Sequence, residues 1–191
     1  MRTRLLALAL TVAVVGAPGV TSAFGQAAAP TRRPDVIYVP TPEPVVEAML
    51  QVANVTKNDV VYDLGCGDGR IPVTAAKKYG ARGVCFDIDP ERIKEANANV
   101  AKNNVGNLVK VVQADLFEQD LSGATVITLY LLPSLNVKLI PQLEKLKPGA
   151  RIISYQFNMD GVKPKETYNG GNGRYTIYKW VAPLEKENKA K

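Results

Sequence analysis

A chain of 191 residues, of which 46% are hydrophobic and 22% charged, is long enough for one globular domain with its own core and too short for two. The net charge of +6 comes without a cluster of Lys and Arg, so it is weak evidence for a nucleic-acid partner. With no histidine and only two cysteines, Cys66 and Cys85, the sequence nearly excludes a Cys/His zinc site and excludes catalysis by a Ser–His or Cys–His pair.

The first 27 residues have the three-part layout of a secretory signal peptide. A short basic start, residues 1–4, precedes an almost wholly apolar run over residues 5–15, and small residues suited to a peptidase follow up to Ala27. The apolar run is well short of the ~20 residues that span a bilayer. We therefore expect export to the periplasm or the medium, with an uncleaved membrane anchor as the alternative. A Pro- and Ala-rich linker over residues 28–34 follows.

The predicted domain covers residues 35–183 and is followed by a charged tail over residues 184–191. Near its start, Thr41 is a good helix N-cap and Pro42 suits the first position of a helix. Apolar residues over 45–52 then fall on one helical face. We expect the first helix of the domain here.

A glycine-rich turn after the first strand organises the rest of the domain. Residues 60–62 are β-branched or aromatic and predict a strand buried in the middle of a parallel sheet. Glycines then alternate through a turn, at Gly65, Gly67 and Gly69, before a helix predicted over residues 71–79. Such a unit aims bare backbone N–H groups and a helix N-terminus at a ligand above the sheet.

Strands and helices alternate through the remainder of the domain. Strands are expected over residues 83–87, 108–112, 124–132 and 150–157, and helices over residues 90–103, with Asp89 as N-cap, and 135–146. A hairpin turn over residues 169–173 joins two last strands, the second over residues 174–181. The sequence therefore predicts an α/β fold: a Rossmann-like, doubly wound, mostly parallel sheet with helices on both faces and a C-terminal antiparallel hairpin.

The spacing of the turn and two later aspartates narrow the class of ligand. A dinucleotide fingerprint, Gly-x-Gly-x-x-Gly, needs its third glycine one residue later than Gly69, which argues against NAD or FAD. Asp87 ends the second strand, where an acidic side chain can accept hydrogen bonds from ribose hydroxyls. Asp115 ends the third strand and is placed to reach the edge of an adenine. We expect an adenosine without a pyrophosphate.

These motifs resemble those of a known enzyme class. Residues 63–69 (Asp-Leu-Gly-Cys-Gly-Asp-Gly), 86–90 and 113–116 resemble the successive motifs of class I, seven-β-strand, S-adenosyl-L-methionine-dependent methyltransferases. More narrowly, residues 38–42 (Tyr-Val-Pro-Thr-Pro), 68–70 and 128–133 are similar to the family of the mitochondrial lysine methyltransferases of the ATP synthase c-subunit and the adenine nucleotide translocase, with its bacterial relatives. The resemblance implies S-adenosyl-L-methionine as the donor and a protein lysine as the acceptor.

The resemblance also implies roles for individual residues. The methionine part of the donor would lie on the glycine turn, with its amino group at Asp63. The ribose would lie at Asp87 and the adenine at Asp115, while Tyr38 and Thr41 would close over the methionine part. The implied donor-binding residues are Tyr38, Thr41, Asp63, Gly65, Cys66, Gly67, Gly69, Asp87, Asp115 and Leu116.

The acceptor side is expected at residues 129–133, Leu-Tyr-Leu-Leu-Pro, where many methyltransferases carry Asn/Asp-Pro-Pro-Tyr. The absence of Asn and Asp argues against an adenine or glutamine amide acceptor. An apolar mouth suits a lysine amine, which must lose its proton before it attacks. Tyr130 and Pro133 are the catalytic candidates, and the general base stays open between Tyr130 and Glu43.

Other functions stay open at this point. A small-molecule acceptor is the second hypothesis. The third is an exported module that binds the donor without catalysis, because the donor is not expected outside the cytoplasm. We expect a monomer, membrane proximity only through the N-terminal apolar run, and neither a metal nor a nucleic-acid partner. Cys66 and Cys85 are expected as buried small hydrophobic residues, with a disulfide as the less favoured alternative.

Overall fold

A seven-stranded sheet forms the centre of the computed structural model, which describes residues 33–187. In sheet order the strands are β3 (Val109–Gln113), β2 (Arg82–Asp87), β1 (Val60–Leu64), β4 (Val126–Leu129), β5 (Arg151–Tyr155), β7 (Tyr175–Val181) and β6 (Glu166–Gly170). The first five are parallel, whereas β7 runs antiparallel to β5 and β6. The predicted Rossmann-like sheet with its C-terminal hairpin is confirmed. The predicted signal peptide, and the linker up to residue 32, lie outside the described residues.

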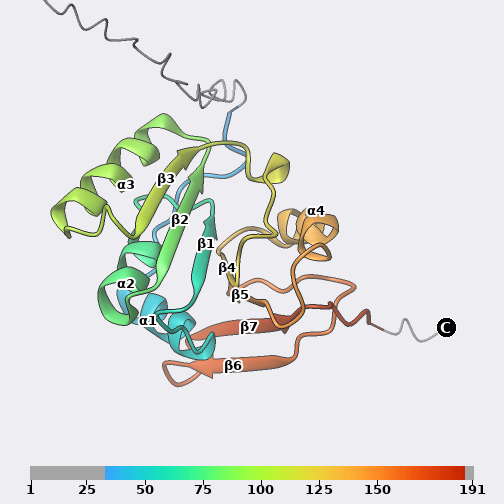
Figure 1. The fold of residues 1–191 in the computed structure, drawn as a ribbon. Coiled ribbons are helices and arrows are strands. Elements are labelled where there is room, and N and C mark those ends of the chain that lie inside the picture. The colour runs from blue at the N-terminus through green and yellow to red at the C-terminus, as the bar shows by residue number, and fades with distance from the viewer. Residues whose placement is uncertain (1–32, 188–191) are drawn as a thin grey trace, which may run out of the picture.

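Helices cover both faces of the sheet, three on one side and fewer on the other (Figure 1). The first face carries α1 (Glu43–Val52), α2 (Arg70–Tyr79) and α3 (Pro90–Lys102), and the second carries α4 (Pro133–Leu143) and the short 3₁₀-helix η1 (Leu116–Glu118). Met49 and Leu50 of α1 are fully buried against the first face, and Leu139 and Leu143 of α4 against the second. Among the described residues, no helix is long and apolar enough to cross a membrane.

Two helices start at other residues than predicted, and a proline stands at each observed start. Pro42 is the N-cap of α1 and Thr41 makes no capping hydrogen bond, so the prediction for Thr41 as N-cap is wrong. α4 begins at Pro133 and not at residue 135, because the ring of Pro133 fixes a φ angle that suits the first helical position. This earlier helix start leaves β4 ending at Leu129, three residues before the predicted end.

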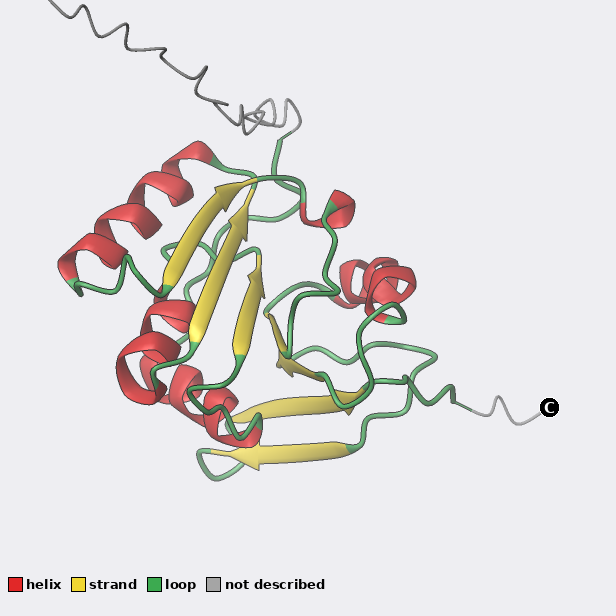
Figure 2. Ribbon diagram, in the orientation of Figure 1, coloured by secondary structure: helices red, strands yellow, loops and turns green. Residues whose placement is uncertain are grey.

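Parallel pairing brings the carboxyl ends of the central strands to one edge of the sheet. Leu64 lies opposite both Phe86 and Leu129, and Asp87 lies opposite Gln113, so β1 to β4 end at nearly the same level. Figure 2 shows the arrowheads of β1, β2 and β3 pointing to this edge. The loops that follow these strands meet there, and they contain the residues predicted to bind a ligand.

The start of α3 is confirmed as predicted and supplies a stability test. Asp89 is the N-cap, its Oδ1 accepts a hydrogen bond from the Glu91 N–H at 2.9 Å, and Pro90 begins the helix. Replacing Asp89 by alanine is expected to lower the free energy of unfolding by about 1 kcal/mol, because one N–H at the helix start loses its acceptor. Urea unfolding followed by circular dichroism measures this. The exposed Lys94→Ala on the same helix is the control, and an equal effect there would contradict the capping role.

Candidate active site

A cleft of about 910 Å³, open to solvent, lies at the carboxyl edge of the sheet. It brings together nine of the twelve residues that the sequence predicts for the site: Tyr38, Thr41, Asp63, Gly65, Cys66, Asp87, Asp115, Leu116 and Tyr130. The other three, Gly67, Gly69 and Pro133, are outside the lining of the cleft.

The glycine turn has the backbone conformation that its sequence predicts. Gly65, Gly67 and Gly69 have φ angles of 76°, 55° and 73°, a region that other residues enter only with strain. The N–H groups of Gly65 and Cys66 both donate to the carbonyl oxygen of Phe86, at 2.9 and 3.0 Å. The turn is therefore bonded to the end of β2, so these two N–H groups are not the bare donors that the sequence predicts. Gly69 leads directly into α2 as its N-cap.

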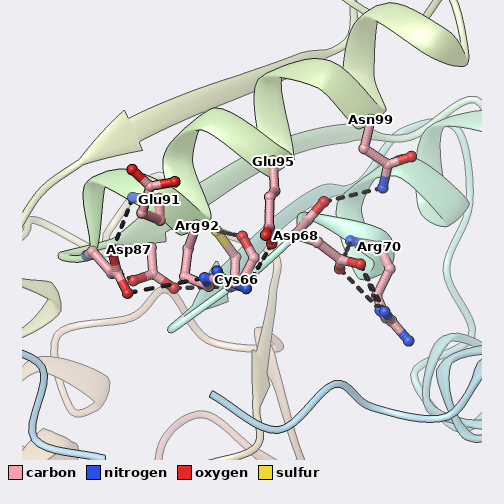
Figure 3. A network of polar contacts seen from close by, with 10 residues as sticks. Cys66, Asp68, Arg70, Asp87, Glu91, Arg92, Glu95 and Asn99 are labelled. Carbon is pink, nitrogen blue, oxygen red and sulfur yellow. Dashed lines mark hydrogen bonds and ion pairs between the residues drawn. The ribbon is translucent and has the colours of Figure 1, made fainter. Parts of the chain in front are cut away.

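Asp87 bonds β2 to the same turn through its side chain. Its Oδ2 accepts a hydrogen bond from the Gly67 N–H at 2.8 Å, and its Oδ1 accepts one from the Asp89 N–H at 3.0 Å. Figure 3 shows this carboxylate directed at the turn that contains Cys66. Burial raises the pKa of Asp87 despite these two donors. Each carboxylate oxygen keeps lone pairs for a further donor, such as a hydroxyl group.

Asp63 is the most deeply buried carboxyl group that faces the cleft, with 3% of the residue exposed. The Thr128 hydroxyl donates a hydrogen bond to its Oδ1 at 2.7 Å. Burial, with a smaller contribution from the charges of Asp87 and Asp68, raises the pKa of Asp63 to about 7, although the bond from Thr128 acts the other way. A cationic group in the cleft would favour the ionised form of this carboxyl group.

Asp115 and Leu116 lie where β3 passes into η1. Asp115 caps η1, because its Oδ1 accepts a hydrogen bond from the Phe117 N–H at 2.9 Å. η1 was not expected from the sequence, and it adds Phe117 to the wall of the cleft beside Leu116. This wall is apolar next to a carboxylate, a combination that suits a purine ring with an exocyclic amine.

Residues 34–39 and Thr41 cover the glycine turn and line the cleft from the other side. The ring of Tyr38 lies directly over Gly67: a Cβ atom added there would come within 2.0 Å of Tyr38 Cε2. The guanidinium group of Arg92, on α3, stacks on that ring 4.7 Å from its centroid. Tyr38 therefore contacts both the glycine turn and α3, and these contacts hold residues 34–39 in place over the turn.

A second arginine fixes the end of this cover. Arg70 forms a two-point ion pair with Asp68, at 2.7 and 2.9 Å, and its Nη1 donates to the carbonyl oxygen of Thr41 at 2.9 Å. The side-chain amide of Asn99 holds the Asp68 carbonyl at 3.0 Å (Figure 3). The sequence assigned no role to these residues or to Arg92. The only sequence signal for Asp68 and Arg70 is the Asp68-Gly-Arg70 motif, which indicated the family but no function for either residue.

The structure places only part of the predicted acceptor segment, residues 129–133, at the cleft, because α4 begins within it. Tyr130, Leu131 and Leu135 line the cleft. Pro133 begins α4 with its side chain exposed, and Glu43 is exposed at the start of α1; neither lines the cleft. Of the predicted catalytic and general-base candidates, only Tyr130 therefore faces the site.

Comparison with known proteins decides the family. Residues 63–166, more than half of the chain, match the ANTKMT methyltransferase domain. The chain belongs to this methyltransferase family. The methyltransferase is 49% identical over 152 residues to a protein-lysine N-methyltransferase of Saccharolobus islandicus (strain REY15A), a match that covers 78% of this chain and 94% of the relative. It is 26% identical over 139 residues to the lysine N-methyltransferase of the ATP synthase c-subunit from Xenopus laevis, which covers 70% and 59% of the two chains.

Solved structures agree on the donor. A crystal structure named an RNA methyltransferase from Salinibacter ruber, in complex with S-adenosyl-L-homocysteine, superposes on the methyltransferase with a TM-score of 0.74. The two chains are 48% identical, and the match covers 80% of this chain and 98% of the other. The protein is an S-adenosyl-L-methionine-dependent methyltransferase.

The residues of the cleft fit this donor. A buried carboxyl group at Asp63 matches an ammonium group, and a carboxylate at Asp87 matches a ribose diol. The apolar wall of Leu116 and Phe117, with Asp115 beside it, matches an adenine. The absence of a side chain at Gly65 leaves room between the turn and Leu131, whose Cδ2 would lie 3.1 Å from a Cβ there, and the absence of one at Gly67 leaves room for the ring of Tyr38.

Removing the carboxylate of Asp87 is expected to weaken donor binding by about 1–3 kcal/mol, that is, roughly 5- to 150-fold. The reason is the loss of charge-assisted hydrogen bonds to the ribose, together with the loss of the acceptor that holds the Gly67 N–H. Titration calorimetry of Asp87→Ala with S-adenosyl-L-homocysteine measures the change. Asp120→Ala, which removes an equal charge from the surface, is the control. An affinity of Asp87→Ala equal to that of the control would refute the ribose assignment.

The two cysteines correct one expectation from the sequence. Cys66 and Cys85 form a disulfide, with their Cα atoms 5.3 Å apart, and are not separate buried thiols. Both are buried, beside Ala96 of α3. Because Cys66 lies within the glycine turn and Cys85 lies two residues before Asp87, the disulfide covalently links the glycine turn to β2. Sequence spacing alone did not show that this separation of 19 residues closes to bonding distance.

Proposed function

We propose that the methyltransferase transfers a methyl group to the side-chain amine of a protein lysine. The observation that carries the proposal is the acceptor side of the cleft: Tyr130, Leu131 and Leu135 line it, and no Asn or Asp stands among residues 129–133 to hold an amide or an adenine. The relative with 49% identity is named a protein-lysine N-methyltransferase, which supports the same acceptor.

The main contributions of the protein to this reaction are to position the two reactants and to exclude water from them. The bound donor supplies an electrophilic methyl group on a sulfonium. The S–CH₃ bond breaks as the N–CH₃ bond forms, and the proton that the ammonium gave up beforehand leaves to solvent. Holding the two reactants in line saves much of the entropic cost of bringing them together.

Deprotonation of the acceptor is the step that the apolar wall assists. A lysine amine has a pKa of about 10.4, so the uncharged form costs roughly 4.6 kcal/mol at pH 7. A wall of Leu131 and Leu135 disfavours the ammonium form and offsets part of this cost. Tyr130 supplies a hydroxyl group on this wall, and its oxygen can accept a hydrogen bond from the uncharged amine after the proton has left to solvent.

Mass spectrometry with a deuteromethyl-labelled donor tests the acceptor. Protein and RNA extracts from cells that lack this chain are each incubated with the enzyme, and peptides and nucleosides are analysed for CD₃ groups. We expect the label on the Nζ of lysine. Label in nucleosides and not in protein would contradict the proposal and favour the chemistry that the name of the Salinibacter ruber structure states. Asp87→Ala, weakened in the donor site, shows that labelling depends on this cleft.

We further propose that the domain works outside the cytoplasm, as the predicted signal peptide implies. The Cys66–Cys85 disulfide supports this, since disulfides persist mainly in oxidising compartments. Fractionation of cells, with mass analysis of the mature N-terminus, tests it. A full-length chain in the cytoplasmic fraction would contradict export, and a full-length chain in the membrane fraction would favour the uncleaved anchor.

A further inference from the structure

Three aromatic rings meet at the carboxyl ends of β4 and β5. The ring centroid of Tyr130 lies 4.4 Å from that of Tyr155 and 6.0 Å from that of Phe157, with the planes of the Tyr130 and Phe157 rings only 17° apart. Tyr130 also lines the donor cleft. We propose that these three residues, the aromatic wall, bind the side chain of the acceptor lysine. This inference rests on the proposed function and names the residues that hold its substrate.

The backbone that carries two of these rings is strained. Gln156, between Tyr155 and Phe157, has a φ of 67°, and the Phe157 N–H donates to the carbonyl oxygen of Tyr155 at 2.8 Å. This is a γ-turn with a positive central φ, the rarer and more strained of the two γ-turn types. The side chain of Gln156 is exposed and does not explain the strain. Backbone strain of this kind is concentrated at functional sites, where the surrounding structure holds it in place.

Buried polar groups hold the strained turn in position. The Ser154 hydroxyl donates to the carbonyl oxygen of Phe157 at 2.7 Å, and the amide of Asn136, on α4, donates to the carbonyl of Asn158 at 3.2 Å. Ser154 and Asn136 are both fully buried. The Gln156 N–H donates to the carbonyl oxygen of Thr176, on β7, at 2.7 Å. Contacts from β5, α4 and β7 therefore fix where the wall stands.

A row of rings leads from the wall to the surface of the hairpin. Tyr155 contacts Tyr175 of β7, with centroids 6.4 Å apart, and Tyr175 contacts Tyr168 of β6 at 6.5 Å. Tyr168 is 47% exposed. The row of rings therefore runs from Tyr130 at the cleft to Tyr168 on the edge strand of the sheet.

Aromatic faces suit a lysine side chain in both of its protonation states. They cover the four methylenes of the stem and attract the ammonium group through the ring quadrupole. A carboxylate at the same place would also bind the ammonium, but its full charge would raise the pKa of the amine more strongly and oppose deprotonation. The wall can therefore hold the acceptor with a smaller penalty for the loss of its proton.

Steady-state kinetics of the full chain tests the wall, with total protein extract from cells lacking this chain as the acceptor and radiolabelled donor. Tyr155→Leu and Phe157→Leu are each expected to lower kcat/KM for the acceptor about tenfold, with the KM for the donor unchanged. Tyr155→Phe, which keeps the ring, should retain most of the activity. Tyr178→Leu is the matched control, because Tyr178 is a half-buried tyrosine of β7 whose ring stacks on Trp180 and not on the wall.

The outcomes separate the wall from the proposed function. An active enzyme whose acceptor kinetics are the same in Tyr155→Leu, Phe157→Leu and Tyr178→Leu would overturn the wall alone. A wild-type enzyme that labels no lysine would overturn the proposed function and the wall with it. Calorimetry with S-adenosyl-L-homocysteine shows that each variant is folded. Loss of this binding in both Tyr155→Leu and Tyr155→Phe would assign the hydroxyl group of Tyr155 to the donor side and also overturn the wall.

Discussion

Replacing Cys66 and Cys85 together by alanine is expected to lower the free energy of unfolding by about 3 kcal/mol. The disulfide closes a loop with a sequence separation of 19 residues, and a crosslink of this span stabilises mainly by restricting the unfolded chain. Both sulfur atoms are buried beside Ala96, so the variant also loses packing at the glycine turn. Urea unfolding of the wild type and the double variant measures the difference.

The same pair gives an internal control through reduction. A dithiol or phosphine reductant should lower the unfolding midpoint of the wild type toward that of the double variant, which itself should not respond. Donor affinity should fall in parallel, because Cys66 lies in the turn whose next residue, Gly67, donates to Asp87. Identical unfolding curves for the wild type with and without reductant would contradict a stabilising disulfide.

Donor binding is expected to weaken about 50-fold as the pH falls from 7 to 5, through the titration of Asp63. Burial raises the pKa of Asp63 to about 7, so the free protein protonates this carboxyl group as the pH falls below 7. The ammonium group of the donor needs the ionised form, and each pH unit below the pKa then costs about a factor of ten. Calorimetry with S-adenosyl-L-homocysteine at several pH values measures the slope. In Asp63→Asn the slope should be much smaller, and in the surface control Asp120→Asn unchanged.

Asp63 also predicts how stability depends on pH. Its folded pKa lies above the unfolded value, so between pH 4 and pH 7 the native state binds more protons than the unfolded state. The contribution of Asp63 to the free energy of unfolding therefore falls as the pH rises through this window, by up to about 4 kcal/mol. Asp63→Asn should be more stable than the wild type at pH 8 and should approach it at pH 4. A variant that is less stable than the wild type at pH 8 would show that Asp63 is ionised in the free protein and that its charge is stabilised by neighbouring groups.

The sheet and the donor side of the site were predictable because their signals are local. β-branched runs mark the buried strands, and Gly65, Gly67 and Gly69 mark a turn with positive φ angles. Parallel pairing then brings the ends of different strands to one edge, so Asp63 and Asp87 meet without any further information. Helix and strand ends were missed by one to three residues where a proline decided them, as at Pro133.

The remaining features depend on contacts between distant segments. Arg70 reaches the carbonyl of Thr41 across 29 residues, and no local pattern encodes that bond. The raised pKa of Asp63 depends on its burial and on the charges around it, which exist only in the folded protein. The strained turn at Gln156 contains no glycine, so the sequence does not indicate it. Its positive φ is imposed by hydrogen bonds from β7 and α4.

A crystal structure of the full chain with S-adenosyl-L-homocysteine tests the central claim most directly, because it shows both where the donor lies and which way its sulfur faces. We expect the ribose hydroxyls on the carboxylate of Asp87, the amino group at Asp63, and the sulfur facing Tyr130 and the aromatic wall. A ligand whose ribose lies away from Asp87, or whose sulfur faces away from Tyr130, would contradict the account.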